Sequence, residues 1–305
     1  MSATHALTDL AAGLLVDGAL KSTALLAAGG LAAWLLRHRP AAERHAALAA
    51  TLATLPLVPL VTFGARGGDV ALTVPYASGL LALWITGAAA ALVPLGAGYL
   101  GLRAATARGR DQGRDGRARL VASDEIALPL TFGWLRPVVL LPAEATRWSS
   151  EVHAAVSAHE RAHVDRADWL VHVLARSACA VLWFHPLVWW VARELDTAAE
   201  EAADDAALQT GIAASTYATA LLALGPGRTR AAALSARGRS CLSRRVRAVL
   251  RSERATGAAR WTVGTLVAAA LIAATLPLAQ AAAWRAQPAA ATAHCNPDTP
   301  PPLYP

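Results

Sequence analysis

Long runs of apolar residues alternate with short arginine-rich segments along this 305-residue chain. A helix needs about 20 mostly apolar residues to cross the hydrocarbon core of a bilayer. Four runs are close to that length, and the last is flanked by Trp261 and Trp284, which are typical interfacial anchors. We therefore predict four transmembrane helices, at about residues 14–36, 46–63, 78–102 and 261–283.

The composition agrees with a membrane protein. The chain is 55% hydrophobic and only 16% charged, whereas soluble domains carry about 25% charged residues. The net charge of +7 comes from arginines beside the apolar runs. Cytoplasmic loops collect such charges, so the loop 37–44 and the region 103–260 are predicted to be cytoplasmic, with both termini outside the cell (inner) membrane. No nucleic-acid-binding motif accompanies the charge, so we expect a bilayer partner and no direct nucleic-acid binding.

The region between the third and fourth runs is predicted to hold the functional domain. Residues 103–119 are rich in glycine and arginine and are predicted to be a cytoplasmic linker. The domain would cover residues 120–260, and a short extracytoplasmic tail, residues 284–305, would follow the fourth span. The predicted fold class is therefore mainly α: a polytopic membrane protein with a cytoplasmic domain that contains a small β-element.

Local patterns place two kinds of element in this domain. Short apolar stretches within residues 120–142, broken by proline and glycine, predict a small antiparallel strand pair. Ser149 or Ser150 then offers an N-cap for a helix that runs to about Arg166.

That helix carries the pattern HExxH, in His159-Glu160-Arg161-Ala162-His163. Residues four apart lie on one helix face, so both imidazoles can bind one tetrahedral zinc ion. Glu160 is placed to accept a proton from water at such a site. We predict a zincin-like metallopeptidase with His159 and His163 as metal ligands and Glu160 as the catalytic base. The alternative is two polar histidines on a solvated helix.

A catalytic zinc site needs a third protein ligand. The acidic helical segment 199–205 offers Glu200 and Asp204, again four residues apart. Glu200 is the predicted ligand and Asp204 is predicted to support the site. Glu201 and Glu194 remain rivals for the ligand role, and the alternative for the whole segment is an acidic, solvated helix face.

Asp168 and Arg166 follow the second histidine closely. Asp168 can hold the free nitrogen of a ligand imidazole, with Arg166 beside it, or the two can form a structural ion pair. We interpret His153, His172 and His185 as surface or packing residues.

The apolar segment 169–191 cannot cross the membrane once, because His163 and Glu200 would then lie on opposite sides and could not share a metal ion. We predict a membrane-associated hairpin at 168–191, broken near Pro186 because proline interrupts a helix. Its three tryptophans are expected at the headgroup level: Trp183, Trp189 and Trp190.

Together these motifs resemble the BlaR/MecR-type membrane metallopeptidases, which are sensor–transducers of bacterial antibiotic resistance. The resemblance implies that His159, His163 and Glu200 bind Zn²⁺ and that Glu160 is the base. It also implies a cytoplasmic winged-helix repressor as the protein substrate. The segments that carry it are Phe132-Gly133-Trp134-Leu135-Arg136-Pro137, Leu141-Pro142, residues 159–168, Trp183-Phe184-His185-Pro186 and residues 200–208.

The chain departs from the family pattern in places. Ala203 stands where cysteine is common, and His185 stands where asparagine is common. A penicillin-binding sensor domain needs a Ser-x-x-Lys nucleophile, and no lysine follows Lys21, so we expect no direct β-lactam sensing. A separate sensor protein and a homo-oligomer are both compatible with these features.

The leading hypothesis is a regulatory protease that cleaves a transcriptional repressor or itself. An HtpX-type quality-control protease also pairs HExxH with a downstream Glu and Asp, but the segments 132–137 and 183–186 argue against it. A non-catalytic signal-relay scaffold would not need Glu160. An extended substrate could add to the strands within 127–141, where we expect residues 138–141 to form the receiving edge.

Overall fold

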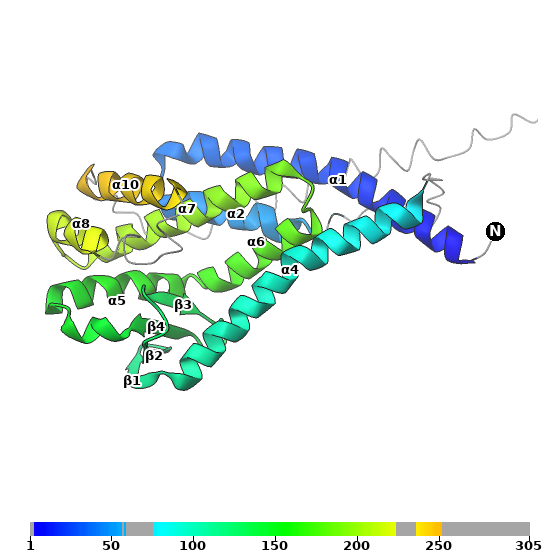
Figure 1. Cartoon of the computed structure of the whole chain (residues 1–305). Coiled ribbons are helices and arrows are strands. Elements are labelled where there is room, and N and C mark those ends of the chain that lie inside the picture. Colours follow the sequence, from blue (N-terminus) through cyan, green and yellow to red (C-terminus); the bar gives the residue numbers. More distant parts are fainter. Residues whose placement is uncertain (1–2, 57, 59–75, 224–235, 252–305) are drawn as a thin grey trace, which may run out of the picture.

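The computed structural model describes residues 3–56, 58, 76–223 and 236–251 (Figure 1). These residues form a mainly helical structure with one small sheet. Its elements are α1 (Ala3–Leu35), η1 (Leu36–His38), α2 (Ala41–Thr54), α4 (Ala77–Arg108), β1 (Arg110–Asp115), β2 (Ala118–Ser123), β3 (Leu130–Phe132), β4 (Val138–Pro142), η2 (Ala143–Arg147), α5 (Ser150–Asp165), α6 (Asp168–Val181), α7 (Pro186–Gln209), α8 (Ala214–Ala223) and α10 (Ala236–Arg251).

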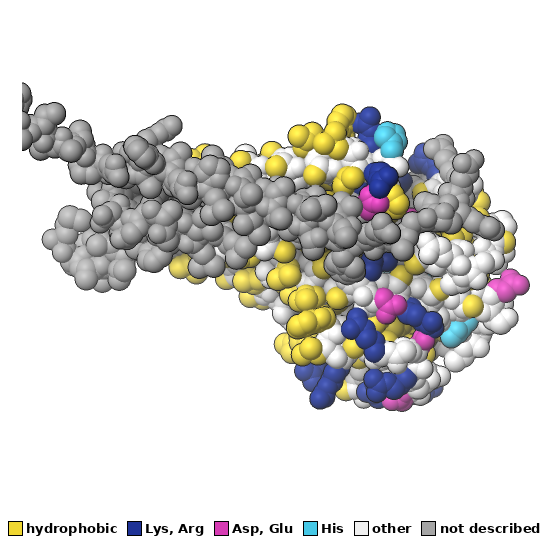
Figure 2. Space-filling view, turned by 180° about the vertical axis from the view of Figure 1, so that it is seen from behind, with side chains coloured by type: hydrophobic (Ala, Val, Ile, Leu, Met, Phe, Trp, Pro, Cys, Tyr) yellow, Lys and Arg dark blue, Asp and Glu magenta, His cyan; other side chains and the backbone are white. Residues whose placement is uncertain are grey.

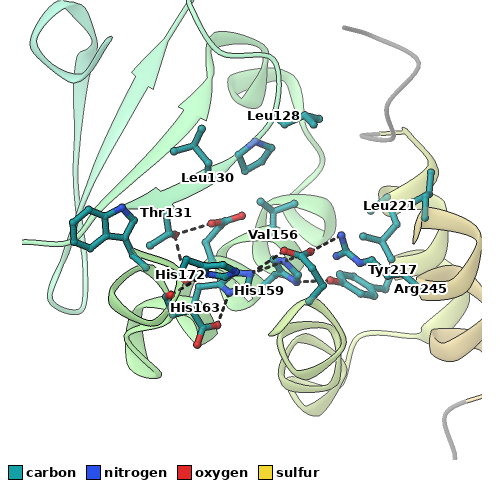
Figure 3. Close-up of a pocket in the computed structure, with 17 residues that line it drawn as sticks. Leu128, Leu130, Thr131, Val156, His159, His163, His172, Tyr217, Leu221 and Arg245 are labelled. Atoms are coloured by element: carbon teal, nitrogen blue, oxygen red, sulfur yellow. Dashed lines mark hydrogen bonds and ion pairs between the residues drawn. The ribbon is translucent and has the colours of Figure 1, made fainter. Parts of the chain in front are cut away.

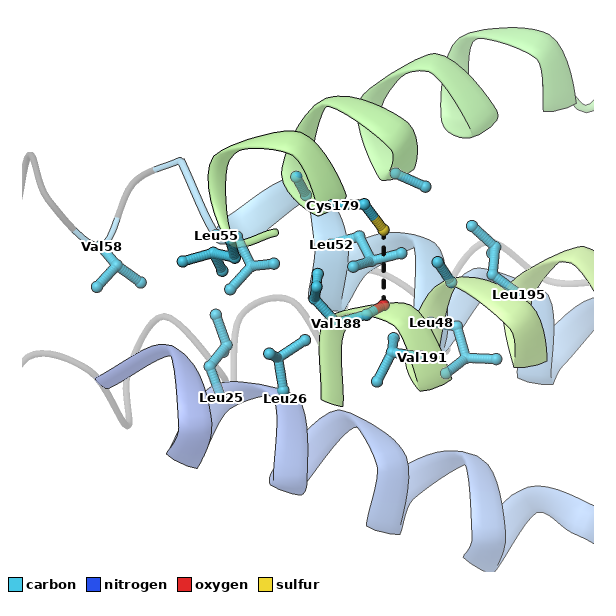
Figure 4. Close-up of a cluster of buried hydrophobic side chains, with 14 of the residues drawn as sticks. Leu25, Leu26, Leu48, Leu52, Leu55, Val58, Cys179, Val188, Val191 and Leu195 are labelled. Atoms are coloured by element: carbon cyan, nitrogen blue, oxygen red, sulfur yellow. Dashed lines mark hydrogen bonds between the residues drawn. The ribbon is translucent and has the colours of Figure 1, made fainter. Parts of the chain in front are cut away.

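The largest hydrophobic core joins α1, α2, α6 and α7 (Figure 4). Side chains from all four helices are almost fully excluded from solvent there, and burial of each large apolar side chain contributes about 1.5–3 kcal/mol. This core fixes the α6–α7 hairpin against the N-terminal helices. Its main members are Leu25, Leu26, Leu48, Leu52, Leu55, Cys179, Val188, Val191 and Leu195.

Two of the described helical segments are long and apolar enough to cross a membrane: Gly18–His38 and Ala77–Arg108. They coincide with the first and third predicted spans. Helix α4 leaves large apolar side chains exposed along its length, among them Leu80, Leu83, Ile85, Leu92 and Val93. The charged side chains visible in Figure 2 lie in the half of the molecule away from the N-terminal ends of these helices.

The other two predicted spans are described only in part or not at all. Helix α2 has 14 residues and covers the beginning of the span predicted at 46–63; the later part of that span lies almost wholly outside the described residues. The span predicted at 261–283 and the tail 284–305 also lie outside the described residues.

The sheet has the strand order β1-β2-β4-β3. β2 and β4 are parallel, whereas β1–β2 and β3–β4 are antiparallel, so the predicted antiparallel pair is present as β3–β4. Because β4 is paired on both sides, the prediction that residues 138–141 form a free edge is wrong. The edge strands of this sheet are β1 and β3.

The prediction of a linker at 103–119 is also wrong. This segment contains the last turn of α4, strand β1 and the start of β2. The Arg119 guanidinium donates to Asp111 across the β1–β2 pair at 2.8 Å, which joins the two strands. Gly116, with φ +57°, supplies the left-handed turn residue between the two strands.

The helix that carries HExxH begins as its sequence predicts. The Ser149 side chain accepts a hydrogen bond from the Val152 backbone N–H, which satisfies one of the free donors at the start of α5. The helix ends at Asp165, and Ala167 follows with φ +55°, which turns the chain into α6.

Helices α6 and α7 form the predicted helix pair, with Pro186 in the first turn of α7. The turn between them packs between α1 and α4: His185 Nε2 lies 2.8 Å from the Thr23 hydroxyl. On the other side, the Trp84 indole donates to the Val181 carbonyl at 2.8 Å, and the Trp183 indole donates to the Trp84 carbonyl at 3.3 Å. Trp183 thus contacts a neighbouring helix.

Helix α4 can approach this turn because residue 87 has no side chain. A Cβ atom at Gly87 would overlap the Trp183 indole, whereas a Cβ atom at Gly96 would meet nothing within 4 Å. We predict that Gly87→Val destabilises the protein by about 1–3 kcal/mol through overpacking. Thermal unfolding in detergent, followed by circular dichroism, would measure this loss. Gly96→Val is the matched control on the same helix, and equal effects of both variants would contradict the packing explanation.

Candidate metal centre

A cavity of about 570 Å³ lies between the sheet and the C-terminal helices (Figure 3). Strand β3 and the loop before it line one wall, and α8 and α10 line the opposite wall. Helices α5, α6 and α7 contribute the polar side chains between them. His159, Glu160, His163 and Glu200 all line this cavity.

His159, His163 and Glu200 bring three ligand atoms within 4.8 Å of one another. The two Nε2 atoms are 3.2 Å apart, and each is 3.7 Å from a carboxylate oxygen of Glu200. Tetrahedral zinc with bonds near 2 Å separates its ligand atoms by roughly 3.3 Å. The spacing of these donor atoms therefore suits a single small cation. No other such group occurs among the described residues.

Both histidines are oriented through their other ring nitrogen. His163 Nδ1 lies 2.7 Å from Asp168 Oδ2, and His159 Nδ1 lies 3.2 Å from Asp204 Oδ1. A carboxylate at Nδ1 assigns the proton to that nitrogen and leaves the lone pair on Nε2. The two Nε2 atoms face each other in this cavity, which is the arrangement that a shared cation requires.

Each of these carboxylates is in turn paired with an arginine. Arg166 Nη2 lies 2.6 Å from Asp168 and also donates to the Ala199 carbonyl of α7. Arg245 of α10 donates to both oxygens of Asp204, at 2.6 and 2.8 Å. Asp168, Arg166 and Asp204 therefore lie around the two histidines, and their support of a metal site stays a prediction.

The charges around the two histidines favour a positive species between them. Burial opposes ionisation of Glu200, but the hydrogen bond with His159 and the charge of Arg245 hold the Glu200 pKa well below its usual range. Burial likewise opposes ionisation of Asp168, yet the His163 hydrogen bond and nearby positive charges lower its pKa to about 2. Burial disfavours charged His159, but Asp204 and Glu200 outweigh it and raise the His159 pKa to about 9.

Glu160 lies beside the ligand atoms on the same helix. Its side chain is buried, and Oε2 accepts a hydrogen bond from the Thr131 hydroxyl of β3 at 2.7 Å. The edge strand of the sheet thus fixes the carboxylate that the sequence predicted to be the base.

The rival carboxylates point elsewhere. Glu201 pairs with Arg44 of α2 and with Arg244 of α10, and neither Glu201 nor Glu194 lines the cavity. Glu200 is therefore the carboxylate of these three that meets the two histidines.

The remaining histidines of the domain fit their predicted packing roles. His172 lines the cavity, but its Nδ1 contacts the Asp168 carbonyl at 2.8 Å and its Nε2 contacts Asp196 at 3.0 Å. His153 is near Trp148 and the Ser157 hydroxyl at the start of α5.

Three residues of the site have no signal in the sequence. Thr131 belongs to a short strand, and Arg245 lies in a segment with several other arginines. The Tyr217 hydroxyl of α8 donates to Asp204 Oδ1 at 2.7 Å and lies 3.0 Å from His159 Nδ1. Only the arrangement of the helices brings these side chains to the ligands.

Helix α2 also reaches the site from its outer side. His45 is buried with Nε2 3.5 Å from Asp168 Oδ1, and the neighbouring Arg44 pairs with Glu201. Two consecutive residues of α2 therefore contact neighbours of the ligands: Asp168, which holds His163, and Glu201, which follows Glu200.

Comparison with known proteins identifies the family. The model of the BlaR1 peptidase M56 family matches residues 70–249, which is more than half of the chain, and the chain belongs to this family. It is also 36% identical over 91 residues to the "Regulatory protein BlaR1" of Bacillus licheniformis. That alignment covers 30% of this chain and 15% of the relative, so the chain matches only a small part of the length of that protein.

The acidic face of α7 generates a prediction about pH. Burial and the charges of Asp204 and Glu201 raise the Asp205 pKa from 3.8 to about 6. The folded protein therefore holds this proton more tightly than the unfolded chain, so Asp205 lowers stability as the pH rises from about 4 through 6. Asp205→Asn should raise the free energy of unfolding by on the order of 1 kcal/mol at pH 8 and have little effect at pH 4.

Denaturant unfolding at both pH values would measure the effect of Asp205→Asn. Asp124→Asn replaces an exposed carboxylate and is the control, which should match the wild-type protein at both pH values. Equal stabilisation by Asp205→Asn at pH 4 and pH 8 would contradict the electrostatic cause.

Proposed function

We propose that this protein is a membrane-embedded zinc metalloendopeptidase. The observation that carries the proposal is the convergence of His159 Nε2, His163 Nε2 and a Glu200 oxygen within one cavity, with Glu160 beside them. When bound there, zinc polarises the scissile carbonyl and activates the attacking water. Membership of the M56 peptidase family supports peptide-bond hydrolysis as the reaction.

Residues of the chain itself transfer the proton and orient the ligands. Glu160 accepts a proton from the attacking water and returns it to the leaving amine, while Thr131 keeps its carboxylate turned toward the cavity. Asp168 and Asp204 hold the ligand imidazoles in the tautomer that leaves Nε2 free.

An extended segment of a protein is the substrate that the cavity suits best. Leu130 and Thr131 of the edge strand β3 line the cavity wall that faces the histidines. The backbone of a substrate added to β3 would run beside α5, so its peptide bonds would pass the ligand atoms. Strand β3 therefore takes the place of residues 138–141 as the proposed receiving edge.

The membrane arrangement is also part of the proposal. We propose that α1 and α4 cross the bilayer with two further spans at 46–63 and 261–283, and that the peptidase domain is cytoplasmic. Leu102 is the cytoplasmic end of the third predicted span. Trp84, which contacts the α6–α7 turn, lies about 27 Å from it along the helix axis. The turn then lies within the bilayer, deeper than the cytoplasmic headgroup level at which we expected its tryptophans.

We further propose that the proteolysis is regulatory and that the substrate is a cytoplasmic repressor of the winged-helix kind, or the chain itself. The name of the Bacillus licheniformis relative, a regulatory protein, supports this reading over a constitutive quality-control protease. A separate sensor protein would supply the signal.

Glu160→Gln tests the catalytic proposal. The variant should keep about one zinc per chain, while self-cleavage and hydrolysis of unfolded casein should fall by at least about a hundredfold because the proton acceptor is lost. Zinc content by atomic emission and cleavage on denaturing gels would measure both. Cleavage by Glu160→Gln at the wild-type rate would contradict the assignment of Glu160 as the base. Zinc binding with no Glu160-dependent cleavage of the chain or of casein would favour a non-catalytic scaffold.

A paired substitution tests the third ligand. Glu200→Gln should weaken zinc binding by at least about tenfold, because the amide cannot replace the carboxylate. Glu201→Gln, on the next residue of α7, should bind zinc as the wild type does. Competition with a chromophoric chelator would give both dissociation constants, and the opposite order of affinities would assign the ligand to Glu201.

A further inference from the structure

Arg245 is the one arginine among the described residues that forms an ion pair with Glu200, the third ligand carboxylate. Its Nη1 lies 2.7 Å from Glu200 Oε2, and its Nη2 lies 2.6 Å from Asp204 Oδ1. The side chain is mostly buried and lines the cavity (Figure 3). One guanidinium from α10 therefore bridges two carboxylates that lie one turn apart on α7.

Anchoring of α10 does not account for this arrangement. Apolar side chains already dock the helix: Val249 is 2% exposed, and Val246 packs in the same cluster with residues of α5, α7 and α8. The neighbouring Arg244 illustrates an ordinary surface pair, with a half-exposed side chain 3.4 Å from Glu201. Arg245 instead points its charge into the cavity, toward the ligand set.

The two oxygens of Glu200 have different surroundings. Oε1 lies 3.7 Å from His163 Nε2 and Oε2 lies 3.7 Å from His159 Nε2, but Oε2 is also held by Arg245. A carboxylate with both oxygens available can bind a metal through both, which fills a coordination position. A hydrolytic zinc site needs that position for water.

We propose that Arg245 is a positioning residue that restricts Glu200 to binding the metal through Oε1 alone, so that a coordination position stays open. The inference rests on the proposed metal site. The forked guanidinium suits this task because it can hold Glu200 and Asp204 at once, and Asp204 in turn contacts His159 Nδ1. Arg245, which lies on α10 and 41 residues after Asp204, thereby completes the metal centre.

Cobalt substitution tests this proposal without relying on activity. Purified protein would be titrated with Co²⁺, whose visible absorption is strong in four-coordinate sites and weak in five-coordinate sites. The wild type should show the strong band. Arg245→Ala should show a weaker band and a Co²⁺ dissociation constant raised about 10- to 100-fold. Added methylguanidinium should restore the strong band in this variant by occupying the vacated position.

Arg244→Ala is the matched control, because it removes the adjacent arginine of α10 and should leave the spectrum and affinity unchanged. Near-ultraviolet circular dichroism would confirm folding, and Arg245→Gln, which keeps much of the side-chain volume, replaces Arg245→Ala if the alanine variant does not fold. A wild-type spectrum and affinity in folded Arg245 variants would overturn the proposal, as would equal changes in Arg244→Ala. Failure of the wild type to bind Co²⁺ would instead overturn the proposed function.

Discussion

The structure depends on holding two imidazoles with their Nε2 atoms 3.2 Å apart in a largely buried position. A proton or a metal cation has to lie between two ring nitrogens at this distance, because two facing lone pairs repel each other and rotation of either ring would relieve that repulsion. A carboxylate at each Nδ1 prevents the rotation and fixes the tautomer. Asp168 and Asp204 therefore determine whether His159 and His163 can act as a pair of ligands at all.

These two carboxylates are themselves placed by parts of the chain that lie far apart. Asp168 begins α6, directly after the turn that ends the HExxH helix, and a local arginine, Arg166, accompanies it. Asp204 reaches the site only because α7 returns along α6, and its arginine, Arg245, comes from α10. One half of the site is thus built from neighbouring residues, and the other half requires the folded arrangement of three helices.

The same hairpin connects the site to the helices that are apolar enough to span a membrane. Its turn is held between α1 and α4 by contacts to Thr23 and Trp84, and close approach requires glycine at positions such as Gly87. Helix α2 adds a second connection, because His45 lies 3.5 Å from Asp168. A shift of these helices would therefore displace the carboxylates that orient the ligands, because densely packed interiors transmit strain.

The sequence by itself determined the features that depend on local periodicity. The four-residue spacing places His159 and His163 on one helix face, Ser149 caps that helix, and Pro186 separates α6 from α7. It also singled out Glu200, because the acidic helical segment 199–205 places Glu200 four residues before Asp204. Tertiary structure alone decided the rest. Within the segment predicted to be a linker, residues 110–115 form strand β1 because β2 satisfies their backbone, and β3 became an edge because β4 is paired on both sides. Tyr217 and Arg245 joined the site through contacts between helices distant in sequence, and no local pattern encodes such contacts.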